Sequence, residues 1–293
     1  MKKQAILIQC HNKPEQINRL ISVMPADKFD FYIHIDKKSD IMCKIIHKNN
    51  VFFSERIDVR WGRFSQVEAT LALFKMVDAS EYSYIHLISG NDFIIKPIEY
   101  IESFFSNNSA EYIESIELPE KLFVWGAMDR VEVWYPQFII DRPSNTVFRA
   151  LRVIYREFVM RTKILKRKNM PVTAFYLGSS WFSLTGGCVE WIKEYLKNNP
   201  DYTEFFRHGV CVDEVFFQTL VHISPYAKNV ANRNMTYMVW GGSKTGGPNE
   251  MKINNLDKML ASDCIFARKF TDMSTINTVC ERLDIKENIT KSS

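Results

Sequence analysis

The chain has 293 residues, long enough to form one large domain or two small ones around a substantial core. Hydrophobic residues make up 46% and charged residues 25%, and the 21 Phe, 12 Tyr and 6 Trp exclude disorder as the main state. Lys and Arg number 38 against 34 Asp and Glu, too mild an excess to indicate nucleic-acid binding, and no apolar run approaches the ~18 residues of a membrane-spanning helix.

The first half alternates short apolar stretches with amphipathic ones. We predict strands at residues 5–9, 29–35, 51–53 and 83–89, and helices at 14–24, 40–48, 65–78 and 97–106. Alternation of strands and helices predicts a mainly parallel sheet with right-handed crossovers. Such sheets bind ligands at the carboxyl ends of their strands.

The second half is less regular. We predict short strands within residues 112–135 and 174–184, helices near 187–198, 212–222 and 256–261, and a glycine-rich loop at 234–248. A further strand is expected at 265–270, and the tail at 276–293 is predicted to be weakly ordered.

The charge is concentrated in residues 142–168, which hold nine basic residues and one acid, Glu157. Apolar residues recur there at helical spacing, and basic residues fall on another side. The apolar set is Phe148, Leu151, Ile154 (or Tyr155) and Phe158, and the basic set is Arg149, Arg152, Arg156 and Lys163. This pattern fits a helix on an anionic membrane surface, and it equally fits a solvated helix that covers the core.

Several motifs of cofactor and metal sites are missing from the sequence. There is no GxGxxG, GxxxxGKS, HExxH or GxSxG, so dehydrogenase, P-loop, zinc-protease and serine-hydrolase chemistries are disfavoured. No DxD is present to hold a divalent ion. The six cysteines show no CxxC spacing and are expected to be free thiols.

Polar residues follow two of the predicted strands. Asp36 closes the strand at 29–35, where a carboxylate could accept hydrogen bonds from a ribose or a base. Ser89, Gly90, Asn91 and Asp92 follow the strand at 83–89, where glycine lets the backbone approach a ligand. A surface carboxylate and a plain tight turn explain the two patterns as well.

Asp213 and Glu214 precede the apolar run Val215–Phe217 at a predicted helix start. The helix dipole lowers the pKa of a carboxylate at this position, whereas burial raises it. The balance of the two effects could give a pKa suited to a general base. Capping of the helix is the simpler explanation.

Arg268 and Lys269 are adjacent cations that could clamp a diphosphate, although two surface cations would look the same. Trp240 beside the glycine-rich loop could stack on a sugar ring or belong to the core.

Seven segments together resemble the core-2/I-branching β-1,6-N-acetylglucosaminyltransferase family, which includes peptide O-xylosyltransferases. Each segment is short, and all seven occur in the family's order through nearly the whole chain. They are Ala5–Leu20 (AILIQCHNKPEQINRL), Ile33–Lys37 (IHIDK), Val59–Leu71 (VRWGRFSQVEATL), His86–Lys96 (HLISGNDFIIK), Gly178–Leu184 (GSSWFSL), Val212–Leu220 (VDEVFFQTL) and Ile265–Phe270 (IFARKF).

The resemblance implies a GT-A-like (Rossmann-like) α/β fold, with a mainly parallel sheet flanked by helices. Residues 1–110 would form the nucleotide-sugar-binding half, and residues 111–275 the acceptor-binding and catalytic half of the same domain. It implies inverting transfer from a UDP-sugar, with no metal or other cofactor. N-acetylglucosamine is the first expectation for the sugar and xylose the second, and a glycan or lipid-linked acceptor would serve surface polysaccharide or lipopolysaccharide synthesis.

The resemblance also implies roles for individual residues. Glu214 matches the catalytic base. On the donor side Lys269 matches a phosphate-binding lysine and Arg268 its helper; the other residues expected there are His11, Asp36, Arg60 and Asp92. The acceptor side is expected to include Trp240, Arg130 and Asp213.

The chain departs from the family pattern at three points. Ile94 and Val212 stand where proline is usual, and a second phosphate-binding arginine has only Lys252 as a positional counterpart. The N-terminal stretch predicts a strand and no export signal, so we expect a cytoplasmic enzyme at the inner face of the membrane. A metal-dependent or retaining transferase, a non-catalytic glycan-binding protein and a nucleic-acid-binding protein are the alternatives.

Overall fold

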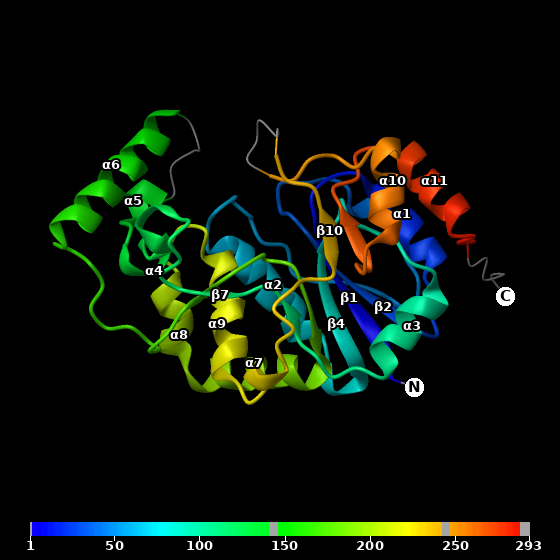
Figure 1. Cartoon of the computed structure of the whole chain (residues 1–293), viewed down its shortest axis with the longest axis horizontal. Coiled ribbons are helices and arrows are strands. Elements are labelled where there is room, and N and C mark those ends of the chain that lie inside the picture. The colour runs from blue at the N-terminus through cyan, green and yellow to red at the C-terminus, as the bar shows by residue number, and fades with distance from the viewer. Residues whose placement is uncertain (1, 141–145, 242–246, 288–293) are drawn as a thin grey trace.

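A computed structural model describes residues 2–140, 146–241 and 247–287 of the chain (Figure 1). Its strands are β1 (Lys3–Cys10), β2 (Phe29–Ile35), β3 (Val51–Phe53), β4 (Tyr82–Ser89), β5 (Phe93–Ile94), β6 (Tyr112–Ile113), β7 (Ile116–Glu117), β8 (Tyr176–Leu177), β9 (Phe182–Thr185), β10 (Thr236–Met238) and β11 (Phe266–Arg268). Its α-helices are α1 (Pro14–Val23), α2 (Ser65–Met76), α3 (Ile98–Ser106), α4 (Asp129–Glu132), α5 (Gln137–Ile140), α6 (Thr146–Thr162), α7 (Gly186–Asn198), α8 (Pro200–Phe206), α9 (Phe216–Ile223), α10 (Leu256–Ala261) and α11 (Met273–Arg282). The short 3₁₀ turns are η1 (Met42–Lys44), η2 (Ala79–Glu81), η3 (Val124–Ala127), η4 (Val212–Glu214), η5 (Ala227–Asn229) and η6 (Ile253–Asn255).

The central sheet has the strand order β3-β2-β1-β4-β9-β6. Its first four strands are parallel, and β9 joins β4 in the antiparallel sense. The register pairs Cys10 with Ile35 and Gln9 with Ser89, so β1, β2 and β4 end at one edge. The prediction of a mainly parallel α/β sheet is confirmed.

Helices cover both faces of this sheet. Successive side chains of a strand point to opposite faces, so the apolar residues of β1 need a packing partner on each side. Ile6 and Ile8 of β1 point into a core shared with α1, α3, α10 and α11, while Ala5 and Leu7 point into a second core with α2, α7 and α9 (Figure 1). A sheet that is buried on both faces reads as a continuous apolar run, which explains the sequence of β1.

A third, smaller core lies beside α6, at the far left of Figure 1. It is built from β-branched, aromatic and sulfur-containing side chains of the segments around α4, α5 and α6: Val133, Tyr135, Ile139, Ile140, Val159 and Met160. Only Val159 and Met160 come from α6 itself, so most of the apolar stripe of this helix faces solvent.

The structure corrects four sequence-based expectations. The helix expected at 40–48 is only η1, and the one at 212–222 is interrupted between η4 and α9. The basic helix expected at 142–168 spans Thr146–Thr162, and residues 142–145 lie outside the described part. The expected weakly ordered tail instead contains α11, whose Ile276 and Val279 are buried; residues 288–293 are not described.

Within the ranges that the structure describes, no helix is long and apolar enough to cross a membrane.

Candidate active site

A cavity of about 380 Å³ opens where the parallel strands end. It is lined by residues at and just after the ends of β1, β2 and β4, by the segment around Trp61, and by side chains from the second half of the chain. These residues are Gln9, Cys10, His11, Asn12, His34, Asp36, Lys38, Val59, Trp61, Gln66, Ser89, Gly90, Asn91, Trp181 and Arg268. We call this space the sheet-edge cavity.

Glycine at position 90 is required by the close approach of β1 and β4. A Cβ atom there would lie 2.6 Å from the Cβ atom of Cys10, and the Gly90 amide donates to the Gln9 carbonyl at 2.9 Å. The backbone after β4 is therefore pressed against the end of β1, which leaves room for a ligand above both.

The predicted residue Asp36 lines the cavity beside Lys38. The backbone amide of Lys38 donates to one Asp36 oxygen at 2.9 Å, and its ammonium group contacts the other at 3.1 Å. Burial lowers the pKa of the neighbouring His34 to about 4, so this imidazole stays neutral and its Nε2 accepts the Ile57 amide at 2.9 Å. His11 also lines the cavity, whereas Arg60 pairs with Asp58 beside it.

Asp92, also expected on the donor side, does not itself line the cavity. Its side chain is fully buried beneath the cavity, where the Ser89 amide donates to it at 3.0 Å and Arg268 Nε lies 3.5 Å away. Burial raises the pKa of this carboxyl, and Arg268 and Ser89 oppose the shift. The Arg268 guanidinium in turn lies 4.4 Å from the centre of the Trp181 ring. Asp92 and Trp181 thus fix a cation at the wall of the cavity.

The segment Gly178–Trp181 joins this cation to the predicted carboxylates. The Gly178 amide donates to the Glu214 carbonyl at 2.8 Å, and Ser180 Oγ donates to Asp213 Oδ2 at 2.6 Å. A Cβ atom at position 178 would lie 1.7 Å from the Glu114 carbonyl oxygen, so only glycine fits.

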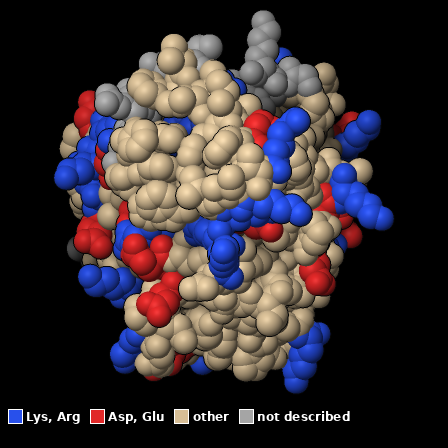
Figure 2. All heavy atoms as spheres, turned by 90° about the vertical axis from the view of Figure 1, so that its left-hand side faces the viewer, with Lys and Arg blue, Asp and Glu red and all other residues tan. Residues whose placement is uncertain are grey.

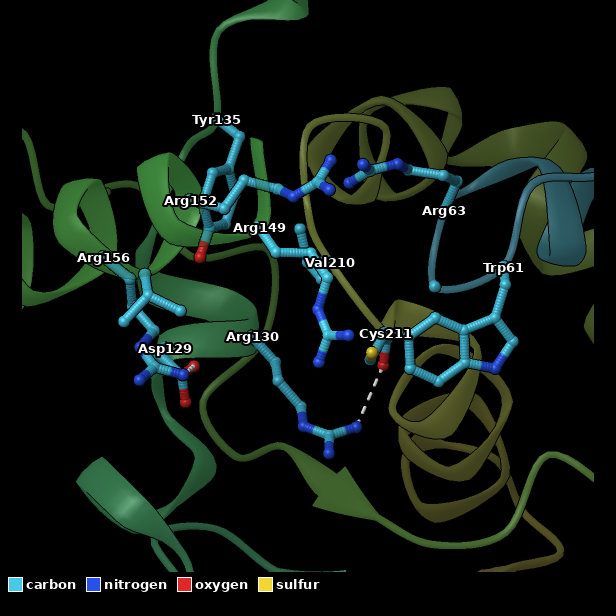
Figure 3. A pocket seen from close by; sticks show the side chains of 12 residues that line it. Trp61, Arg63, Asp129, Arg130, Tyr135, Arg149, Arg152, Arg156, Val210 and Cys211 are labelled. Atoms are coloured by element: carbon cyan, nitrogen blue, oxygen red, sulfur yellow. Dashed lines mark hydrogen bonds and ion pairs between the residues drawn. The ribbon is translucent and has the colours of Figure 1, made fainter. Parts of the chain in front are cut away.

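Glu214 and Arg130, both predicted site residues, form an ion pair. The Glu214 side chain is 39% exposed, while Arg130 is more buried and also donates to the Cys211 carbonyl at 3.2 Å. Arg130 lines a second cavity, of about 260 Å³, between α6 and the loop that carries Trp61 (Figure 3). We call it the arginine cavity, since its lining includes Arg63, Arg130, Arg149, Arg152 and Arg156.

Trp61 lines both cavities and separates them. Its indole is 81% exposed, and nothing in the sequence analysis assigned it a role. Trp181 was missed as well. Both lie inside segments that carry the family resemblance. Their being aromatic residues within such segments was the signal that could have identified them as candidate site residues.

Six of the predicted residues are absent from the lining of both cavities: Arg60, Asp92, Asp213, Glu214, Lys269 and Trp240. Lys269 follows Arg268, and its amide donates to the Asn249 carbonyl at 3.4 Å. Trp240 is exposed beside residues 242–246, which are not described. No three His, Cys, Asp or Glu side chains gather as a metal centre anywhere in the described ranges, and all six cysteines are free thiols.

Asp213 is buried directly behind Glu214. Burial, together with the negative charge of Glu214, raises the pKa of Asp213 to about 6 from an ordinary value of 3.8. The folded protein therefore holds this proton to a higher pH than the unfolded chain does.

The free energy of unfolding should consequently fall as the pH rises from about 4 to about 6, because unfolding then releases the Asp213 proton. Relative to the wild type, Asp213→Asn should gain about 2 kcal/mol of stability between pH 4.5 and pH 7. Urea unfolding at both pH values measures this, with the exposed Asp263→Asn as control. An Asp213→Asn variant that follows the wild type at both pH values would contradict the assignment.

Comparison with known proteins places the chain among branching enzymes. Residues 7–260 match the family model described as "Branch: Core-2/I-Branching enzyme". Xylosyltransferase 2 of Bos taurus is 23% identical over 289 residues, which cover 91% of this chain and 31% of that protein. Xylosyltransferase 2 of Rattus norvegicus is 22% identical over 311 residues, which cover 96% and 33%. The chain thus spans about a third of the length of these relatives.

Among solved structures, S. aureus TarS aligns at a TM-score of 0.30 and 14% identity, over 39% of this chain and 21% of that one. The WbbM bifunctional glycosyltransferase aligns at a TM-score of 0.40 and 10% identity, over 92% and 46%. The family match covers most of the chain and includes five of the seven segments of the sequence resemblance in full. The chain therefore belongs to the Core-2/I-branching enzyme family.

Proposed function

We propose that this chain is a glycosyltransferase that moves a sugar from a UDP-sugar to a hydroxyl group of a glycan acceptor, with inversion at the anomeric carbon. Family membership supports glycosyl transfer. The observation that carries the proposal is the pair of cavities that share Trp61, with Arg268 in one and the Glu214–Arg130 pair at the other.

The sheet-edge cavity is the proposed donor site. Asp36 would accept hydrogen bonds from the nucleoside, and Arg268, with Lys269 next to it, would face the diphosphate. The leaving diphosphate gains negative charge as the glycosidic bond breaks. A cation already fixed by Asp92 and Trp181 stabilises that charge more in the transition state than in the ground state, which lowers the barrier.

Glu214 is the proposed general base. Its carboxylate would take the proton from the acceptor hydroxyl as that oxygen attacks the anomeric carbon and the diphosphate leaves from the opposite face. The ion pair with Arg130 orients the carboxylate, and the hydrogen bond from Gly178 fixes the backbone that carries it.

UDP-N-acetylglucosamine is the proposed donor, in the synthesis of a surface polysaccharide or lipopolysaccharide at the cytoplasmic side of the membrane. UDP-xylose is the second candidate, and the similarity to xylosyltransferase 2 favours it. Thermal-shift measurements with each nucleotide sugar separate the two, since a ligand present at about 100 times its Kd stabilises a protein by ~2.7 kcal/mol.

An exposed apolar stripe on α6 supports a peripheral membrane contact. Leu151, Ile154 and Phe158 lie at helical spacing, and Ile154 is 65% exposed. Figure 2 looks at the side of the molecule that carries α6 and shows an area without charged side chains, bordered by Lys and Arg. Arg161 and Lys163 follow the stripe in the sequence at the end of α6, whereas Arg149, Arg152 and Arg156 line the arginine cavity. An apolar stripe with flanking cations suits a bilayer rich in anionic phospholipid.

Replacing Glu214 by glutamine should lower turnover by more than ~100-fold, because the amide cannot accept the hydroxyl proton. Binding of UDP, measured by calorimetry, should be nearly unchanged, which separates catalysis from folding. The control is Glu204→Gln, an exposed residue of α8. Full turnover in Glu214→Gln would remove this residue from the mechanism.

Transfer should be as fast in EDTA as without it, since we propose that protein cations and no metal ion neutralise the diphosphate. Arg268→Ala should instead lower turnover by about 10²–10³-fold, the effect of removing one charge-stabilising donor. A product assay after dialysis against EDTA measures the first effect. A strict requirement for a divalent ion would refute the metal-free proposal.

The double variant Ile154→Asp, Phe158→Asp should lose at least ~10-fold in affinity for vesicles that contain anionic phospholipid, because it places charges on the inserted stripe. Cosedimentation measures the affinity, and Tyr100→Asp, on α3 at the other end of the molecule, is the matched control. Equal binding of the double variant and the wild type would disprove the membrane contact.

A further inference from the structure

The arginine cavity contains far more positive than negative charge. Five of its lining residues are arginines, and Asp129 supplies the one carboxylate among them. Figure 3 shows the guanidinium groups of Arg63, Arg149 and Arg152 directed into the space between α6 and the Trp61 loop. The five arginines of the cavity come from three separate parts of the chain, so the fold, and not local sequence, gathers them.

Nearby carboxylates offset only part of this charge. Asp129 lies 3.6 Å from Arg156, and Glu214 pairs with Arg130. Arg149 and Arg152 form no ion pair within the described residues; Arg152 has a long contact of 3.5 Å to the Ile139 carbonyl. Burial lowers the pKa of Arg152, and the nearby Arg149 adds to that shift. Like charges held together in this way repel one another unless an anion lies between them.

The location of the cavity relates it to the acceptor. Arg130 belongs to its lining and pairs with Glu214, whereas Trp61 separates it from the sheet-edge cavity. A group bound here would lie on the opposite side of Trp61 from the proposed donor. At about 260 Å³ the cavity is slightly smaller than the roughly 300–1,000 Å³ of most ligand sites, and so suits one small charged unit.

We propose that the arginine cavity binds an oxyanion, phosphate or carboxylate, carried by the acceptor saccharide next to the hydroxyl group that is glycosylated. This rests on the proposed function, because it assumes that Glu214 faces the acceptor. Guanidinium groups match both oxyanions through paired N–H donors, which lysines would not. The acceptor class is therefore an anionic glycan, and a neutral glycan would leave Arg149 and Arg152 without a counter-charge.

The test measures binding of small sugars to the full chain saturated with UDP, so that the donor site is already occupied. Calorimetric titrations with glucose 6-phosphate, glucuronate and glucose compare the two oxyanions with a neutral sugar. At least one anionic sugar should bind and glucose should not. Preference for glucose 6-phosphate identifies a phosphate-bearing acceptor, and preference for glucuronate a carboxylate-bearing one.

The double variant Arg149→Ala, Arg152→Ala should weaken binding of the anionic sugar at least ~10-fold, since two charge-assisted contacts are removed. Its affinity for UDP should stay unchanged, which shows that it is folded. Arg161→Ala is the control, because Arg161 lies on the same helix, is 72% exposed and does not line the cavity.

Equal binding of glucose and the anionic sugars, or undiminished binding by the double variant, would overturn the proposal. The titrations need no transfer of sugar. They can also be repeated without UDP. The proposed function fails if UDP does not bind or if Glu214→Gln keeps full turnover. Neither result depends on the anionic sugars, so the two failures can be told apart.

Discussion

The segment Gly178–Trp181 is the constraint on which the rest of the site depends. It donates a backbone hydrogen bond to Glu214 and a hydroxyl hydrogen bond to Asp213, and its Trp181 ring lies against Arg268. Residues that are far apart in the chain thereby keep a fixed relation across the edge of the sheet. Because position 178 has no room for a side chain, the segment cannot shift without displacing its neighbours.

The electrostatics of the two cavities differ in a way that fits two substrates. In the sheet-edge cavity Lys38 is paired with Asp36, and Arg268 is held in place by Asp92 and Trp181, which suits a diphosphate that gains charge as it leaves. In the arginine cavity several cations converge with little counter-charge, which suits a group that is anionic throughout. Glu214 lies at the second cavity through its pair with Arg130, where a proton acceptor would meet an incoming hydroxyl.

The sequence predicts the sheet and the edge at which its parallel strands end well, because period, glycine and strand-end residues are local signals. Asp36, Gly90 and His11 lie where parallel strands must end together. The orientation of α6 was beyond such reasoning. Its periodicity separates an apolar face from a basic one but cannot tell which face meets the protein, and here Arg149 lines a cavity while Ile154 faces solvent. The pairing of Glu214 with Arg130 likewise depends on tertiary structure.

The central claim is that donor and acceptor meet on either side of Trp61, between Arg268 and Glu214. A crystal structure of the chain with UDP and an anionic acceptor saccharide tests it most directly. We expect the diphosphate against Arg268 in the sheet-edge cavity and an acceptor hydroxyl within hydrogen-bond distance of Glu214. A nucleotide bound elsewhere, or an acceptor hydroxyl on a surface remote from Glu214, would contradict it.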